Sequence, residues 1–361
     1  MVIIYHFFIY FDIINIKVRL MKSIYGITLE KLKKYFENIG EKPFKAIQVY
    51  EWIYKKRVNS FDEFSNLKKD TISKLKEDFT FTKIKLVDKK TDKDVSKYLF
   101  ESEDKNKIEA VLMNHDYGNS LCVSTEVGCN MGCKFCESGR LKKVRNLNTN
   151  EMVEQILTIE SLEGIRISHV VLMGIGEPFD NSDHVIDFID IINEGKGIDI
   201  GARHITVSTC GLVPKIIEFM NHGKQVNLAI SLHAPNNELR DKLMPINRAY
   251  KLEELMSVLK KYVAKTNRRV TFEYILLSGV NDTLECAKEL ANLVKDLNCY
   301  INLIPYNETS HIEFKRSSQD TIMAFYDCLK KNKINVTIRR EFGGNVDAAC
   351  GQLRSNYEEG K

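Results

Sequence analysis

Three closely spaced cysteines carry the strongest chemical signal in the sequence. Cys129, Cys133 and Cys136 are separated by three and then two residues, and they directly follow an apolar, β-prone run. Three thiolates on one loop can hold three irons of a [4Fe–4S] cluster and leave the fourth iron open. An open iron is what a chelating amino-acid cofactor needs. The spacing therefore predicts an iron–sulfur site that binds such a cofactor.

A zinc knuckle is the alternative for the same three cysteines. Structural zinc usually has four ligands that come in pairs, and no paired Cys/His set lies nearby in the sequence to complete four. This absence argues against zinc, and a zinc-stabilised RNA-binding protein remains as the non-catalytic alternative. An anaerobic preparation separates the two, because an iron–sulfur protein is brown whereas a zinc protein is colourless.

Two further cysteines stand where a thiol could do chemistry. Cys350 lies in a loop rich in glycine and alanine, where small neighbours let a thiol approach a ligand closely. Cys122 lies seven residues before the cysteine motif, and strand alternation places it on the same face as Ser124. A buried structural thiol is the plain alternative for both. Four others are expected to pack as small hydrophobic residues: Cys210, Cys286, Cys299 and Cys328.

The elements that must position these residues alternate along the chain from residue 121 onward. We expect strands at Leu121–Thr125, His169–Met173, His204–Ser208, Val226–Leu232, Val270–Leu277, Tyr300–Pro305 and Val336–Ile338. We expect helices between them, notably at Thr149–Leu162, Asp183–Ile192, Leu252–Val263, Thr283–Leu297 and Thr321–Lys331. Six or seven such units predict an α/β fold with a parallel barrel or part of one. Barrel chemistry lies on loops at the carboxyl ends of strands, where the cysteine motif falls.

The segment before the barrel predicts a smaller, mainly helical module. Residues 27–78 show short helical periodicities, one of which starts at Ser65-Asn66, and strands are expected near residues 83–87, 98–100 and 107–113. The polar segment Asn114–Ser120 predicts a turn. We divide the chain into an extension (1–20), a helical domain (21–95), linking strands (96–120), the barrel with its C-terminal cysteine loop (121–353) and a tail (354–361).

Composition and charge bound the class of protein. The 361 residues are 43% hydrophobic and 28% charged, as in an ordinary globular protein. Residues 21–97 hold 19 Lys and Arg against 12 Asp and Glu, so a basic module precedes a mildly acidic remainder. This asymmetry suits an RNA-docking domain, and a solvated Lys-rich surface is the alternative. Further basic residues are expected to contact phosphates: Lys142, Lys143, Arg145, Lys315, Arg316, Arg339 and Arg340.

The first residues of the chain and its nine cysteines indicate in which cellular compartment the protein is expected. Residues 2–16 are apolar but shorter than the roughly 20 residues that span a bilayer. They also lack the basic start and small-residue cleavage site of a signal peptide. We expect this extension to add nothing to the fold, and a peripheral membrane anchor is the alternative. Nine cysteines in a Lys-rich chain without a secretion signal predict reduced thiols and a cytoplasmic protein.

Further motifs follow the expected strands in order. They are Gly174-Ile175-Gly176-Glu177-Pro178, Val207-Ser208-Thr209-Cys210-Gly211, Ile230-Ser231-Leu232-His233-Ala234, Leu303-Ile304-Pro305-Tyr306-Asn307 and Asp347-Ala348-Ala349-Cys350-Gly351-Gln352-Leu353. Taken singly, the Gly-x-Gly indicates only a tight turn, His233 a core or loop histidine, and Asn307 a turn residue. With the cysteine motif, and in this order, the set resembles the RlmN/Cfr family of radical-SAM RNA adenine methyltransferases over residues 21–353.

The resemblance implies a fold and cofactors. The fold would be a partial (βα)6 radical-SAM barrel with a small N-terminal helical domain of an RNA-binding type. One [4Fe–4S] cluster would be ligated by Cys129, Cys133 and Cys136. Two molecules of S-adenosylmethionine would be used per turnover. The residues that match the family's cofactor-binding positions are Gly176, Glu177, Ser208, Ser231, Leu232, His233 and Asn307.

The resemblance also implies roles for three catalytic residues. An aromatic carbon of adenine is not nucleophilic, so its methylation needs a radical route that a cofactor supplies. Cys350 would accept a methyl group and carry its carbon to the base. Cys122 would remove the ring proton and then form a disulfide with Cys350 that releases the RNA. Glu109 matches the family's proton acceptor, and the sequence leaves open how Cys122 and Glu109 divide the proton transfers. Without the resemblance, Glu109 would be a solvated strand residue.

Partners and regiochemistry follow from the same resemblance. The expected substrate is an adenosine of 23S ribosomal RNA, with tRNA as a further candidate and a reduced flavodoxin or ferredoxin as electron donor. We expect a monomer and no membrane partner. Proline after Glu177 resembles the housekeeping enzymes that methylate adenine C2, and the C8 enzymes of the antibiotic-resistance (Cfr) branch are the alternative. A radical-SAM enzyme with a non-RNA substrate would have no use for both Cys350 and Cys122.

Overall fold

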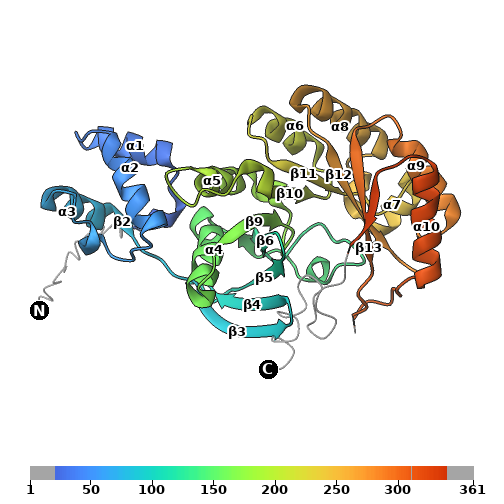
Figure 1. Cartoon of the computed structure of the whole chain (residues 1–361), viewed down its shortest axis with the longest axis horizontal. Coiled ribbons are helices and arrows are strands. Elements are labelled where there is room, and N and C mark those ends of the chain that lie inside the picture. The colour runs from blue at the N-terminus through green and yellow to red at the C-terminus, as the bar shows by residue number, and fades with distance from the viewer. Residues whose placement is uncertain (1–20, 310, 340–361) are drawn as a thin grey trace, which may run out of the picture.

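A computed structural model describes residues 21–309 and 311–339 of the chain (Figure 1). Among these residues, the largest unit is a ten-stranded mixed sheet with the order β14-β13-β12-β11-β10-β9-β6-β5-β4-β3. Its strands are β3 (Lys85–Asp92), β4 (Val95–Glu101), β5 (Lys107–His115), β6 (Gly118–Val123), β9 (Ile167–Leu172), β10 (Ile205–Thr209), β11 (Asn227–Ser231), β12 (Val270–Leu276), β13 (Cys299–Pro305) and β14 (Val336–Ile338). The two ends of the described sheet do not pair with each other, so the fold is a partial barrel.

Helices alternate with the strands from β6 onward, and this alternation makes that part of the sheet parallel. β6 pairs with β9 in parallel, and parallel pairing continues through β10, β11, β12 and β13 to β14. The helices are α4 (Thr149–Glu163), α5 (Ser182–Asn193), α6 (Val213–Asn221), α7 (Asn237–Leu243), α8 (Leu252–Thr266), α9 (Leu284–Val294) and α10 (Gln319–Lys331). A parallel connection needs such a crossover element. The α/β prediction is confirmed.

An antiparallel extension is joined to the barrel at β6. The strands β3, β4, β5 and β6 follow one another as a meander, and β6 pairs with β5 on one side and with β9 on the other. The strands that the sequence predicted as links are therefore continuous with the sheet of the barrel. β6 belongs at once to the meander and to the parallel barrel.

A small helical module precedes the sheet (Figure 1). Its elements are β1 (Lys22–Ser23), η1 (Ile24–Gly26), α1 (Leu29–Asn38), α2 (Phe44–Tyr50), η2 (Glu51–Lys55), η3 (Phe61–Glu63), α3 (Lys69–Asp78) and β2 (Phe79–Thr80). Leu32, Phe36, Val49 and Leu75 are buried in its core. Arg57 forms an ion pair with Glu160 of α4, which fastens the module to the barrel.

Short elements complete the description. They are β7 (Glu126–Val127), β8 (Arg145–Asn146), η4 (Glu137–Arg140), η5 (Pro178–Asn181), η6 (Ala202–His204) and η7 (Pro245–Arg248). No helix within the described ranges is long and apolar enough to cross a membrane.

Two local predictions were wrong. The predicted turn at Asn114–Ser120 is mostly strand, because Asn114 pairs with Asn119 and His115 with Gly118, which leaves a two-residue loop. Polar side chains at the exposed end of a hairpin resemble a loop in composition. The helix expected from Ser65-Asn66 begins instead at Lys69, after a turn that closes the preceding short helix.

Candidate active site

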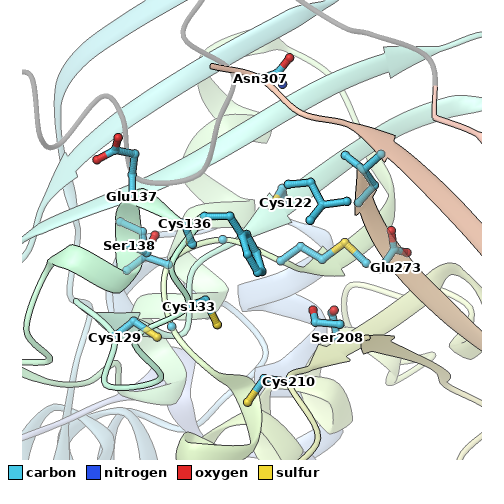
Figure 2. Close-up of a pocket in the computed structure, with 18 of the residues that line it drawn as sticks. Cys122, Cys129, Cys133, Cys136, Glu137, Ser138, Ser208, Cys210, Glu273 and Asn307 are labelled. Atoms are coloured by element: carbon cyan, nitrogen blue, oxygen red, sulfur yellow. The ribbon is translucent and has the colours of Figure 1, made fainter. Parts of the chain in front are cut away.

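A cavity of about 330 Å³ lies inside the barrel, bounded by the carboxyl ends of its strands and the loops that follow them. It gathers residues that the sequence singled out from seven separate segments: Glu109, Cys122, Cys129, Cys133, Cys136, Gly176, Glu177, Ser208, Ser231, His233 and Asn307. Figure 2 shows many of these side chains around it. Leu232 is buried but does not line the cavity. Cys350 lies outside the described residues.

The three motif cysteines lie on a tightly closed loop. Cys129 N–H donates to the carbonyl of Leu141 at 3.0 Å, and Cys136 N–H donates to that of Cys133 at 3.3 Å. A Cβ atom on Gly139 would come within 2.6 Å of the Cys133 carbonyl oxygen, so only glycine allows this approach. The backbone of the loop therefore fixes where the three side chains start.

The chemistry of these thiols fits an iron–sulfur cluster. Burial raises the pKa of Cys129 to about 12 and raises the pKa values of Cys133 and Cys136 as well, so without a bound metal ion these thiols are neutral. Metal binding is what turns such thiols into thiolate ligands. Within the described residues, no three His, Cys, Asp or Glu side chains are already gathered as metal ligands. The fit rests on three soft donors that line one cavity.

The loop Gly174–Glu177 after β9 is held by the chain that leaves β6. Gly174 N–H donates to Val123 O at 3.1 Å, and Ile175 N–H donates to the Ser124 hydroxyl at 2.9 Å. A Cβ atom on Gly174 would lie 2.7 Å from the backbone nitrogen of Ser124, and one on Gly176 would lie 2.6 Å from the side chain of Glu126. Both glycines are needed because two backbones touch here.

The carboxylate of Glu177 is used within the protein. Its Oε1 accepts from Phe179 N–H at 3.0 Å, and its Oε2 accepts from Cys210 N–H at 2.7 Å. Burial raises the pKa of Glu177, and these two hydrogen bonds oppose the shift. The side chain thus ties the end of β9 to the end of β10. Both carboxylate oxygens of Glu177 are therefore engaged by the protein itself.

A cluster of three charged side chains, Glu126, Lys143 and Asp180, supports the Gly-Glu loop (Gly174–Glu177). Glu126 Oε2 accepts from Glu177 N–H at 3.0 Å, and Lys143 Nζ lies 2.6 Å from Glu126 Oε1. Lys143 also reaches Asp180 Oδ2 at 2.7 Å, just after the Gly-Glu loop. Burial raises the pKa of Glu126 to about 7, and Lys143 opposes that shift. Lys143 belongs to the segment after the cysteine motif, so one side chain joins both loops.

A buried arginine joins the ends of the next two strands. The side chain of Arg240 is fully buried and donates to the carbonyls of Cys210 at 2.7 Å and of Ser231 and Leu232 at 3.2 Å each. Its Nη1 donates to Asn247 Oδ1 at 3.1 Å. These contacts fix the strand ends that carry Ser208 and Ser231.

His233 is held as a neutral ring. Its Nδ1 accepts from Ile275 N–H at 3.0 Å, which leaves the proton on Nε2. Burial and then the charge of Arg240 lower its pKa to about 3. The residue has a positive φ of 55°, which turns the chain at the end of β11. His233, which lines the cavity, therefore carries a single ring N–H donor.

The opposite wall is apolar and carries Cys122. Val95, Met113 and Cys122 form a small cluster of buried side chains, with Val111 and Met173 packed against it. Burial raises the pKa of Cys122 to about 11, although the positive charge of Arg339 opposes the shift. Glu109 lines the same side and is buried. Cys122 is thus a neutral thiol beside a buried carboxyl residue.

Sequence reasoning missed several residues of the cavity. Glu273 and Cys210 line it, and so does Arg339, whose expected contact with a phosphate stays a prediction. An acidic residue at an inward position of an apolar strand was the available signal for Glu273. Lys143 and Arg145 were also expected to contact phosphates, but Lys143 serves the buried cluster, and Arg145 pairs with Asp104 and Glu151.

Comparisons with known proteins agree on one family. Residues 123–294 match the model of the radical SAM superfamily, and residues 22–80 match that of the ribosomal RNA large subunit methyltransferase N-terminal domain. A Listeria welshimeri protein described as a probable dual-specificity RNA methyltransferase RlmN is 55% identical over 92% of this chain and 93% of its own length. An Enterococcus faecalis protein with the same description is 55% identical over 92% and 96%.

A solved structure supports the same assignment. The crystal structure of a radical SAM methyltransferase from Sphaerobacter thermophilus matches with a TM-score of 0.85 and 39% identity, covering 92% of this chain and 98% of that one. Two family models, relatives matched over nearly their whole length and a fold matched across both modules leave one conclusion: the chain belongs to the RlmN family of radical-SAM RNA methyltransferases.

Proposed function

We propose that this chain methylates C2 of a specific adenosine in 23S ribosomal RNA, and of one in tRNA, through a methylated cysteine. The observation that carries the proposal is the single cavity that brings the cysteine motif and the Gly-Glu loop together with Cys122 and Glu109. A cofactor bound at the first two features would face the thiol and the carboxyl residue across the same space. The relatives' description as dual-specificity RNA methyltransferases supports the two classes of RNA.

The cofactors implied by the family have matching residues here. Cys129, Cys133 and Cys136 would hold a [4Fe–4S] cluster, which together with S-adenosylmethionine would supply the radical that activates a methyl group. The backbone of Gly176 and Glu177 would receive the amino-acid part of S-adenosylmethionine. Ser208, Ser231, His233 and Asn307 offer hydrogen-bonding groups farther along the cavity. We propose two S-adenosylmethionine molecules per turnover, one of which methylates a cysteine.

In this proposal Cys350 acts in the first steps of the reaction and Cys122 in the last steps. Cys350 carries the methyl carbon that becomes bonded to the adenine ring. Cys122 removes the proton from that ring carbon. Its thiolate then attacks the sulfur of Cys350, and the bond between that sulfur and the transferred carbon breaks with its electron pair left on the carbon. A proton then completes the methyl group, and the RNA is released as the Cys122–Cys350 disulfide forms. The raised pKa of Cys122 requires a base in the cavity before the thiol can accept a proton, and Glu109 is the nearest candidate on that wall.

The partners of the enzyme complete the proposal. The adenine must leave its stack to enter a buried cavity, which costs a few kcal/mol in RNA that is already folded. RNA not yet assembled into a ribosome is therefore the better substrate. We propose a cytoplasmic monomer that receives electrons from a reduced flavodoxin or ferredoxin.

The methylated position is the first test. The reconstituted enzyme is incubated with ribosomal RNA, with tRNA and with S-adenosylmethionine, and the nucleosides are separated against 2-methyladenosine and 8-methyladenosine standards. We expect 2-methyladenosine from both RNAs. A product dominated by 8-methyladenosine would move the chain to the C8 branch while leaving the cysteine mechanism in place.

The cysteine roles are tested by the fate of the RNA. Cys122→Ala should form the bond between RNA and protein but not resolve it, so the variant should purify with covalently attached RNA. Cys350→Ala should form no such bond. Turnover of Cys122→Ala with free RNA would remove the role proposed for Cys122. Full iron content in Cys129→Ala, Cys133→Ala and Cys136→Ala would remove the cluster assignment.

A further inference from the structure

One strand of the cavity wall carries a buried carboxyl group that the proposed chemistry does not use. Glu273 lies on β12 and lines the cavity, and only 6% of its surface is exposed. Figure 2 shows its carboxyl group among the side chains that surround the cavity. Burying such a group costs free energy unless it has hydrogen-bond partners. The partners of Glu273 therefore indicate what it is for.

Glu273 stands in a row of polar side chains across three neighbouring strands. Ser231 of β11 pairs in register with Glu273, and Glu273 pairs in register with Asn302 of β13. Register partners on adjacent strands lie about 4.8 Å apart, and their side chains point to the same face. A hydroxyl, a carboxyl and an amide group therefore stand side by side at one level of the barrel.

Asn302 orients the carboxyl group of Glu273. Its Nδ2 donates to Glu273 Oε2 at 2.8 Å. Oε1 has no hydrogen-bond partner among residues 21–309 and 311–339 and is left for a ligand. Burial raises the pKa of Glu273, while the charge of Arg339 and the Asn302 hydrogen bond oppose the shift. The second oxygen of the carboxyl group can accept a hydrogen bond from a neutral hydroxyl group.

The position of the row along the sheet indicates which ligand reaches it. The Gly-Glu loop follows β9, and β12 is separated from β9 by β10 and β11. A ligand held at both places would pass over Ser208 and Ser231, which also line the cavity. An anionic group would be repelled by Glu273, and an apolar group would leave it unpartnered. A neutral sugar diol offers both donors and acceptors.

We propose that Glu273, oriented by Asn302 and flanked by Ser231, binds the ribose hydroxyls of S-adenosylmethionine. The inference rests on the proposed function, because it assumes that this cofactor occupies the cavity. β12 lies four strands away from β6, which carries Cys122, so the row does not belong to the wall assigned to the RNA base. Contact with the RNA base instead of the cofactor is an outcome that the test separates.

The experiment measures equilibrium binding in the absence of RNA. Cluster-reconstituted protein is titrated by calorimetry with S-adenosylhomocysteine and with its 2′-deoxy and 3′-deoxy analogues. Glu273→Met, of similar length without hydrogen-bonding groups, should bind S-adenosylhomocysteine about tenfold more weakly, the loss expected for one hydrogen bond to a buried carboxyl. One deoxy analogue lacks the hydroxyl that Glu273 contacts. Glu273→Met and the unaltered protein should bind that analogue with equal affinity. Glu273→Gln should restore most of the affinity.

Controls separate this inference from the proposed function. Iron content and melting temperature report whether each variant folds and holds its cluster. Glu238→Met changes an exposed glutamate of α7 outside the cavity and should bind as the unaltered protein does. If Glu273→Met does not fold, Asn302→Leu provides the test, because it leaves the carboxyl group in place without its donor.

Two results would overturn the inference. One is equal weakening for S-adenosylhomocysteine and for both deoxy analogues, which would make Glu273 a shaping residue only. The other is unchanged affinity in Glu273→Met, including the case in which only RNA binding is lost. If the unaltered protein itself fails to bind S-adenosylhomocysteine, the proposed function falls with the inference. Binding by the unaltered protein without an effect of Glu273 overturns the inference alone.

Discussion

The two walls of the cavity are built by opposite means. The wall from β9 to β12 is polar and fixed by buried hydrogen bonds: Glu177 holds the end of β10, Arg240 holds the ends of β10 and β11, and Lys143 holds the Gly-Glu loop. The wall from β4 to β6 is mainly apolar, with Val95, Met113 and Cys122 packed together. The hydrogen bonds of the first wall fix the positions of individual groups, whereas the packing of the second wall fixes a shape.

Under the proposed function, the difference corresponds to how each ligand would be held. A cofactor that must present one bond to an iron needs pre-organised polar contacts, and these stand on the β9–β12 wall. A flat base that enters and leaves needs little more than apolar surface and one reactive thiol. Changes on the polar wall should therefore cost more than changes on the apolar wall, and the following predictions test that order.

Arg240→Met should have the largest effect on stability. It leaves the buried carbonyls of Cys210, Ser231 and Leu232 without their donor, which should lower the free energy of unfolding by about 3–5 kcal/mol. Urea denaturation followed by circular dichroism measures the loss. Arg248→Met, an exposed neighbour in η7, is the matched control and should stay within about 0.5 kcal/mol. Equal stability of the two variants would contradict the comparison.

Lys143→Met should separate cofactor binding from cluster retention. The change leaves Glu126 and Asp180 without their shared cation, so the Gly-Glu loop loses its support. We expect S-adenosylhomocysteine affinity to fall about ten- to hundredfold while iron content stays unchanged. Lys143→Arg should recover most of the affinity, and Lys142→Met, at the exposed neighbouring position, should change nothing. Loss of iron in Lys143→Met would show that the cluster loop depends on the same contact.

His233 gives the polar wall a dependence on pH. Its folded pKa of about 3 lies below the ordinary 6.5, so the unfolded state binds the proton more readily. The contribution of the neutral ring to stability is complete above pH 6.5 and is lost as the pH falls from 6.5 toward 3. The loss in unfolding free energy amounts to about 2 kcal/mol at pH 5. His233→Asn should flatten the fall in unfolding free energy between pH 7 and pH 5. Parallel pH profiles for the two proteins would refute this.

Val95→Ala should have the smallest effect. It removes two methyl groups from the apolar wall and should cost about 1 kcal/mol of stability, since the side chain already borders a cavity. S-adenosylhomocysteine affinity should not change, whereas the KM for RNA should rise a few-fold. A tenfold fall in cofactor affinity would show that the two walls are not independent.

The fold could be predicted largely from the sequence, because strand–helix alternation is a strong periodic signal. β12 was expected at Val270–Leu277 and runs from Val270 to Leu276. The turn between β5 and β6 was predicted too long, at Asn114–Ser120, because the ends of both strands are polar and hydrogen-bond register is invisible in composition. Membership of the family is confirmed, and the individual residue roles stay predictions.

The support of the site was harder to predict than the site itself. Motif spacing indicated the cysteines, the Gly-Glu pair and His233. Arg240 and Lys143, by contrast, look like surface residues of ordinary helices and loops. Their function arises from contacts between segments far apart in the chain, such as Lys143 with Asp180. A single sequence carries no record of such contacts.

The strand β6, shared by the meander and the barrel, determines how far apart two of the candidate site residues lie. Cys122 lies on it and Cys129 follows seven residues later, so the same stretch of backbone sets the distance between the thiol proposed to resolve the adduct and the first proposed iron ligand. Because β6 is paired on both sides, it cannot slide without breaking two ladders at once. A one-residue insertion between Cys122 and Cys129 would therefore leave the cluster and the thiol each intact but out of phase.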